Sequence, residues 1–316
     1  MQLRQALSAA IERLTNALVP SPRMNAELLI MFTLDCDRAY LYAHPERELT
    51  AGEMQRYDEA LARRATGVPA QYITGHQEFW GLDLIVSPAV LVPRPETEHV
   101  VETVLELVSR AKKNQDQEPR TGAFAPHGAG EAPALRIVDV GTGSGAIAIA
   151  LAKELPSAEI DATDISAEAL EVARANAARH ELTARIQFHQ TDLLRGLPPR
   201  APNAGAPGNP GLPPGRFDFV VSNPPYVGES EEDQVQLEVR KFEPRSAVFA
   251  GPTGLEVIER LIPQAREALD PGGWLVFEIS GTIADRVRRL LSGWAEVAIT
   301  NDLQGIARVA RARKTA

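Results

Sequence analysis

Two short segments of the sequence hold residue types that can do chemistry. One is the glycine loop Gly141-Thr142-Gly143-Ser144-Gly145, and the other is the tetrapeptide Asn223-Pro224-Pro225-Tyr226. The side-chain oxygen of Asn223 and the carbonyl of Pro224 are two acceptors that match the two N–H groups of a planar –NH2. The prolines stiffen this loop, and a tyrosine ring can stack on a flat amide or base. The tetrapeptide therefore predicts a site for a planar nitrogen.

The glycine loop has the surroundings of a cofactor site. It lies between an expected strand and a helix that begins at Ala146, so it presents backbone N–H groups to a ligand. Asp164 ends the next strand, where a carboxylate can bind a ribose diol, and Leu193 follows the third, where adenine contacts can lie. The loop also fits the dinucleotide fingerprint, so by itself it allows a nicotinamide dinucleotide or S-adenosylmethionine. The candidate cofactor-binding residues are Gly141, Thr142, Gly143, Ser144, Gly145, Asp164, Leu193 and Asn223.

The elements that must position these residues alternate between strand and helix. We expect strands at 135–140, 159–163, 186–189, 217–222 and 274–279, the last after a Pro271-Gly272-Gly273 turn, helices at 146–155 and 166–180, and a closing pair at 297–300 and 306–309. Such alternation predicts an α/β fold with a doubly wound, mostly parallel sheet. The tetrapeptide then lies at the carboxyl end of the fourth strand, beside the ligand crevice of such a sheet.

The chain before this sheet is expected to hold a small helical domain over residues 1–75. An apolar stripe from Leu3 to Leu18 and the capping box Thr50-Ala-Gly-Glu53 indicate short helices. Residues 76–94 are expected to form a β-hairpin linker, with β-like runs at 79–82 and 90–92. Residues 95–316 are then expected to form the α/β domain, which starts with a helix after Pro93. The expected domain carries two flexible insertions, at 113–134 and 196–215, of which the second is rich in proline and glycine.

Composition excludes several classes of protein. There are 33 Lys plus Arg and 42 Asp plus Glu, a formal net charge of −9, which argues against a broad grip on nucleic acid. The single cysteine excludes a disulfide framework, and the six histidines show no ligand spacing, so we expect no metal. The sequence shows neither a membrane span nor a signal peptide, and a reducing, cytoplasmic setting is expected.

Several segments together give the chain a specific resemblance. These are the glycine loop, the tetrapeptide, Gly75–Gly81, Val92–Glu98, Phe242–Arg245 with Ala250-Gly251, and Pro271–Glu278. Nearly the whole chain resembles the protein-(glutamine-N5) methyltransferases of peptide chain release factors, the PrmC/HemK family. At Leu193 the chain departs from the family, whose members often have an aromatic residue there.

The resemblance implies an S-adenosylmethionine-dependent methyltransferase that acts on the glutamine of a release factor's Gly-Gly-Gln loop. It implies that Asn223, Pro224 and Tyr226 are catalytic, and that Asn223, Pro224, Pro225 and Tyr226 bind the substrate amide. The helical domain over residues 1–75 would recognise the release factor. The enzyme is expected to be a monomer, with no direct contact to nucleic acid or membrane.

Three other functions compete with this interpretation. An adenine-N6 methyltransferase acting on DNA or RNA uses the same tetrapeptide, but such enzymes expose a base and carry a basic surface, which this acidic chain lacks. A nicotinamide oxidoreductase would leave the tetrapeptide unexplained. A non-catalytic binding protein would have no need of an intact glycine loop and tetrapeptide together.

Overall fold

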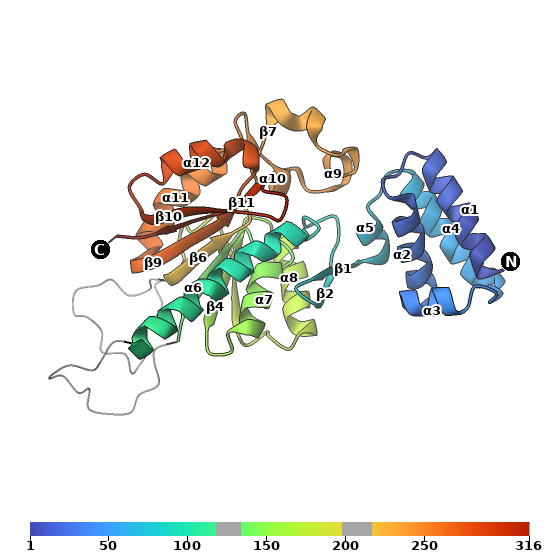
Figure 1. Ribbon diagram of the computed structural model, residues 1–316, viewed down its shortest axis with the longest axis horizontal. Helices are drawn as coiled ribbons and strands as arrows, with labels where there is room; N and C mark the ends of the chain where they lie inside the picture. Colours follow the sequence, from blue (N-terminus) through green and yellow to red (C-terminus); the bar gives the residue numbers. More distant parts are fainter. Residues whose placement is uncertain (118–133, 198–216, 316) are drawn as a thin grey trace.

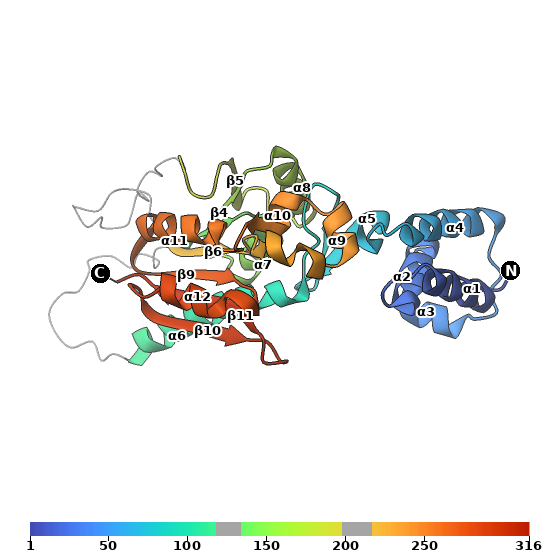
Figure 2. The same cartoon turned by 90° about the horizontal axis from the view of Figure 1, so that it is seen from above.

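The computed structural model describes residues 1–117, 134–197 and 217–315. A helical bundle at one end of the molecule is joined through a β-hairpin to a larger body built around a sheet (Figures 1 and 2). Within the described residues, no helix is long and apolar enough to cross a membrane.

The bundle forms its own hydrophobic core. Its helices are α1 (Leu3–Asn16), α2 (Pro22–Leu34), α3 (Arg38–Ala43), α4 (Ala51–Ala65) and α5 (Ala70–Thr74). The predicted capping box is confirmed, because Thr50 Oγ1 accepts from the amide of Glu53 and the Glu53 carboxylate accepts from that of Thr50. The prediction that Leu18 belongs to the apolar stripe of the first helix was wrong. It lies beyond the end of α1 with a left-handed φ of 57° and is 89% exposed, because the chain has already turned toward α2.

The predicted hairpin exists but uses different residues. Its strands are β1 (His76–Phe79) and β2 (Leu82–Ile85), and the turn falls at Trp80-Gly81, where both φ angles are positive. Residues 90–92, expected as a strand, are not in one. The side chain of Asn176 on α8 donates to the Ile85 carbonyl (2.9 Å) and accepts from its amide (2.7 Å). The hairpin is therefore docked against the sheet body.

The central sheet has seven strands in the order β10-β11-β9-β6-β3-β4-β5. They are β3 (Arg136–Val140), β4 (Glu159–Asp164), β5 (Ile186–Gln190), β6 (Phe217–Ser222), β9 (Leu269–Glu278), β10 (Ala295–Asn301) and β11 (Ala307–Arg313). All neighbours pair in parallel except β11, which is antiparallel to both β9 and β10. The doubly wound sheet and its closing pair are thus confirmed, and the strand order reverses at β3.

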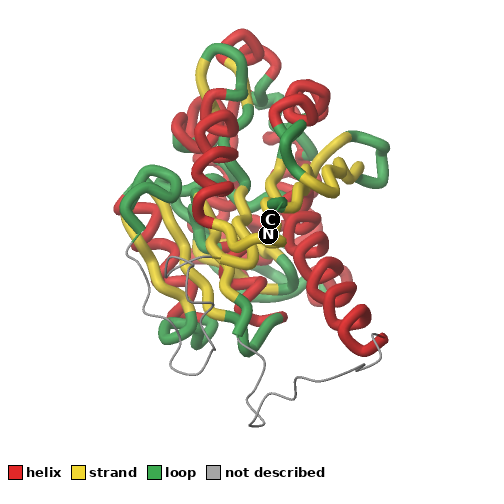
Figure 3. Tube along the Cα trace, turned by 90° about the vertical axis from the view of Figure 1, so that its left-hand side faces the viewer, coloured by secondary structure: helices red, strands yellow, loops and turns green. Residues whose placement is uncertain are grey.

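The remaining elements surround this sheet (Figure 3). The helices are α6 (Glu98–Gln117), α7 (Ala146–Glu154), α8 (Ala167–Arg179), α9 (Leu237–Phe242), α10 (Arg245–Val248), α11 (Glu256–Ala268) and α12 (Ala284–Leu290). Short 3-10 turns are η1 (Pro95–Thr97), η2 (Glu229–Gln234) and η3 (Gly281–Ile283), and β7 (Val227–Gly228) pairs with β8 (Phe249–Gly251).

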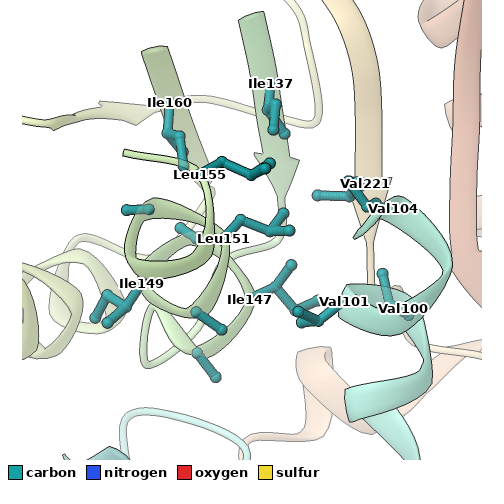
Figure 4. Packing of buried hydrophobic residues seen from close by; sticks show 14 of the residues in the cluster. Val100, Val101, Val104, Ile137, Ile147, Ile149, Leu151, Leu155, Ile160 and Val221 are labelled. Carbon is teal, nitrogen blue, oxygen red and sulfur yellow. The ribbon is translucent and has the colours of Figure 1, made fainter. Parts of the chain in front are cut away.

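Both faces of the sheet are buried. Alternate residues of each strand point to opposite faces, so Ile137 packs with α6 and α7 whereas Val138 packs with α11 and α12. Figure 4 shows the first of these cores, where Ile147 of α7 meets Val101 of α6 and Leu151 of α7 lies below the strand that carries Ile137. Burial on both faces explains why these strands read as continuous apolar runs.

Two expected boundaries were misplaced. Strand β9 begins at Leu269, so Pro271-Gly272-Gly273 lies inside the strand at a shift in its register with β6 rather than in a separate turn. Helix α6 continues to Gln117, so the first five residues of the expected insertion 113–134 are helical. Residues 118–133 and 198–215 of the two expected insertions lie outside the described residues.

Candidate active site

The glycine loop is held in shape by two carboxylates. From β3, Asp139 Oδ2 accepts from the hydroxyl of Thr142 (2.6 Å) and from the amide of Ala148 (3.2 Å). From β4, Asp164 Oδ2 accepts from the amide of Gly143 (2.9 Å). Burial raises the pKa of Asp139 to about 7, opposed by the two hydrogen bonds that it accepts. Asp139 is therefore a buried residue that stabilises the conformation of the loop.

Glycine is required at the end of this loop. Gly145 has a φ of 86°, and a Cβ there would meet the side chain of Ile149 at 3.0 Å and that of Ala173 at 3.3 Å. A side chain would thus be strained by the backbone and would also push apart α7 and α8. The next two residues, Ala146 and Ile147, begin α7 and line a cavity.

This cavity measures about 380 Å³, which suits a small-molecule ligand. It lies at the carboxyl ends of β3, β4 and β6, at the reversal of strand order where open α/β sheets bind ligands. Of the candidate cofactor-binding residues, Gly141–Ser144, Asp164 and Leu193 line it and Gly145 does not, and Asn223 and Pro225 line it from the end of β6. The structure therefore brings the two predicted segments to one cavity.

Asp164 occupies the position expected for a ribose-binding carboxylate. Its Oδ1 accepts from the amide of Ser166 (2.9 Å), while its Oδ2 holds the glycine loop. Burial raises the pKa of Asp164, and the hydrogen bonds from backbone amides oppose that shift. Leu193, which also lines the cavity, has a left-handed φ of 57°, and the neighbouring Asp192 forms an ion pair with Arg260 of α11.

The tetrapeptide is fixed by contacts on both of its sides. The hydroxyl of Ser222, just before it, donates to the carbonyl of Val140 (2.7 Å) and so ties β6 to the start of the glycine loop. Asn223 Nδ2 donates to the hydroxyl of Thr97 (3.0 Å). In the described part of the chain, the cavity wall includes Asn223 and Pro225 but neither Pro224 nor Tyr226. Tyr226 packs on the α11 side, and its hydroxyl donates to Glu278 (2.9 Å).

Sequence reasoning missed Thr97 as a site residue and did not include Glu278 among the candidate site residues. Thr97 lies in η1 and lines the cavity, and its hydroxyl donates to Glu278 Oε2 (2.6 Å) at the end of β9. Glu278 is 1% exposed, and burial raises the pKa of its carboxyl. The proline-rich segment before α6 was the available signal for Thr97, but nothing in the sequence pairs it with Asn223.

A second set of contacts joins the bundle to the cavity wall. Arg64 of α4 is 3% exposed, and its guanidinium donates to Asn25 within the bundle (2.7 Å) and to Glu238 of α9 (2.6 Å). A few residues further on, Glu243 accepts from the amide of Val92 (3.2 Å) and pairs with Arg94. Segment 237–249 therefore reaches from the bundle to α10, which lines the cavity.

Among the described residues, no cluster of three or more candidate ligands could hold a metal.

The fold and the site together define the class of protein. Residues 131–283 match the methyltransferase domain family. The solved structure of the hMettl16 catalytic domain in complex with MAT2A 3'UTR hairpin 6 is similar in fold, with a TM-score of 0.52, 17% identity and 82% of each chain covered. The fold is that of the S-adenosylmethionine-dependent methyltransferases.

Similarity over the whole chain narrows this class to one family. Residues 5–75 match the PrmC N-terminal domain. The chain is 50% identical to the release factor glutamine methyltransferase of Koribacter versatilis, over 99% of each chain. It is 41% identical to that of Chlorobaculum tepidum, over 90% of this chain and 87% of the relative, and 35% identical to that of Coxiella burnetii, over 99% of each. The chain belongs to the release factor glutamine methyltransferase family.

Proposed function

We infer that this protein methylates the side-chain amide nitrogen of the glutamine in the Gly-Gly-Gln loop of peptide chain release factors. One observation carries the chemistry: Asn223 lines the same cavity as the glycine loop, whose Gly143 amide donates to the Asp164 carboxylate. Family membership identifies the substrate class. The enzyme is proposed to act as a cytoplasmic monomer, without direct contact to nucleic acid.

S-adenosylmethionine fits the glycine side of the cavity. The volume of about 380 Å³ is in the range of small-molecule sites, and the amides at the start of α7 can meet a carboxylate. Asp164 would accept from the ribose hydroxyls, while Gly141–Gly145 would follow the methionine portion and Leu193 would contact the adenine. The cofactor supplies an electrophilic methyl group. The chain's own residues have to hold the glutamine nitrogen beside it.

The tetrapeptide is proposed to do this. An amide nitrogen is a poor nucleophile because its lone pair is delocalised into the carbonyl. Asn223 Oδ1 and the carbonyl of Pro224 would accept its two N–H groups and fix its distance and direction. The same acceptors favour the positive charge that develops on nitrogen during transfer. Pro225 would shape the wall. Tyr226 lies outside the cavity wall, with its hydroxyl on Glu278, and is proposed to hold the amide plane from there.

The domain over residues 1–75 is proposed to recognise the release factor, with residues 76–94 as the connection and 95–316 as the methyltransferase domain. The bundle has its own core and lies at one end of the molecule, so a large substrate can contact it while its loop enters the cavity. The bridge from Arg64 to Glu238 supports this proposal, because it links the bundle to the segment that reaches the cavity.

Transfer of radiolabelled methyl from S-adenosylmethionine tests the function. Purified protein should label a release factor but not a variant whose Gly-Gly-Gln glutamine is replaced by alanine. Adenine-containing DNA or RNA should take up no label. Labelling of the nucleic acid with none on the release factor would assign the protein to the base-modifying enzymes instead.

A further inference from the structure

A line of hydrogen bonds supports Asn223 from behind the cavity. Asn223 Nδ2 donates to Thr97 Oγ1 (3.0 Å), Thr97 Oγ1 donates to Glu278 Oε2 (2.6 Å), and the Tyr226 hydroxyl donates to Glu278 Oε1 (2.9 Å). Thr97 and Glu278 are 4% and 1% exposed. These four residues come from η1, the tetrapeptide and the end of β9, so three separate parts of the chain meet here.

Glu278 determines which groups donate and which accept along this chain of hydrogen bonds. A carboxylate can only accept hydrogen bonds, so both hydroxyls that contact it must donate. Burial and the charge of Glu96 raise the pKa of Glu278, whereas the hydrogen bonds from Thr97 and Tyr226 and the charge of Arg308 oppose that shift. In the structure both hydroxyls donate to the Glu278 carboxyl group. Once Thr97 has given its only proton to Glu278, it can only accept from its other neighbour.

This direction determines how the Asn223 amide is turned. An asparagine amide has a donor end and an acceptor end of nearly the same shape, so packing alone does not distinguish them. Thr97 needs a donor, so the –NH2 end of Asn223 turns to it and Oδ1 is left for the cavity. The reversed amide would present two donors to a substrate –NH2, which itself has only donors to offer.

We propose that Thr97 and Glu278 are positioning residues of the methyl transfer, which hold Asn223 with its oxygen toward the substrate nitrogen. The inference rests on the proposed function, since only a substrate that donates from nitrogen needs an acceptor there. It adds two residues outside the tetrapeptide to the machinery that orients the amide.

Replacing one hydroxyl tests the proposal. Thr97→Val keeps the shape of the side chain but removes the acceptor, so the hydrogen bond that holds the –NH2 end of Asn223 away from the cavity is lost. We expect kcat on a release factor to fall by about tenfold or more, less than when the contacting group itself is deleted. The KM for the release factor and the Kd for S-adenosylmethionine should change by less than about twofold. Thr97→Ser restores the hydroxyl and should recover most of kcat.

Thr103→Val is the matched control. Thr103 is also buried, at 5% exposed, and its hydroxyl donates to the carbonyl of His99 within α6, away from the cavity. This variant should keep the wild-type kcat. Cofactor affinity and the melting temperature should be measured on every variant. A variant that keeps both but loses kcat has a wrongly oriented Asn223 amide, whereas a variant that loses both has a damaged fold.

Glu278→Gln is a second, independent variant. Its new –NH2 can donate to Thr97, which frees the threonine proton to turn toward Asn223, so kcat should again fall with cofactor affinity retained. If the wild type methylates the release factor and both Thr97→Val and Glu278→Gln keep kcat within about twofold, the positioning role is wrong while the proposed function stands. Failure of Thr97→Ser to recover kcat also overturns it. A wild type that leaves the release factor unmodified overturns both.

Discussion

The two sides of the cavity are built in different ways. The cofactor side consists of a continuous loop between β3 and α7, shaped by carboxylates at the ends of neighbouring strands. The substrate side depends on side chains far apart in the chain, since Thr97 lies 126 residues from Asn223 and 181 from Glu278. In the proposed function, backbone amides would hold a cofactor whose shape is constant, whereas side chains of definite polarity would orient one substrate nitrogen.

This difference predicts that the two sides can be damaged separately. The largest effect is expected from Asn223→Ala, which removes an acceptor at the reacting nitrogen. The rate of methylation should fall by at least about 10², the cost of losing one preorganised polar contact. Cofactor affinity, measured by calorimetry, should change far less, because the glycine loop and Asp164 are proposed to provide most of the cofactor contacts. Near-normal turnover would mean that the tetrapeptide is only a turn.

Asp164→Ala should damage the opposite side. Loss of charge-assisted hydrogen bonds should weaken cofactor binding by about 1–3 kcal/mol, with a smaller change in rate at saturating cofactor. Because burial raises the pKa of Asp164 and the ionised form is the acceptor, wild-type affinity should fall on acidification at a higher pH than for an ordinary aspartate. In Asp164→Ala, cofactor affinity should not show this loss on acidification. Unchanged affinity in calorimetry would contradict the assignment.

Removing residues 1–67 tests whether the bundle belongs to the substrate side. The cut keeps Tyr72, whose hydroxyl donates to the carbonyl of Val90 in the sheet body. We expect kcat/KM on an intact release factor to fall about tenfold, since contacts remote from the reacting atoms contribute to that ratio. Cofactor affinity should persist and serves as the check on folding. An undiminished rate would argue against substrate recognition by the bundle.

The smallest effect is expected from Thr50→Ala, which removes the capping box of α4. The free energy of unfolding should fall by about 1 kcal/mol, measured by urea denaturation, with no change in cofactor affinity. Thr66→Ala, at the other end of the same helix, is the control and should cost less. A loss of cofactor binding would mean that the bundle and the cavity are not separable.

The same contrast explains how much could be predicted from the sequence. The glycine loop, Asp164 and the tetrapeptide are local patterns, and their place at the carboxyl ends of alternating strands follows from the doubly wound fold. The partners of Asn223 were missed because Thr97 and Glu278 meet it only once η1 and β9 are in place. The second strand of the hairpin was placed at the wrong residues for a related reason. Hydrogen bonds between Ile85 at the end of β2 and Asn176 on α8 form only in the folded protein.

Mass spectrometry of a release factor incubated with enzyme and S-adenosylmethionine tests the central claim most directly. The account predicts the mass of one added methyl group on the peptide that contains the Gly-Gly-Gln loop, with fragment ions that place it on the glutamine side chain. Asn223→Ala, compared at the same time point, should leave most of that peptide unmodified. An unmodified glutamine after full incubation with wild-type enzyme, or a methyl group on another residue, would contradict the account.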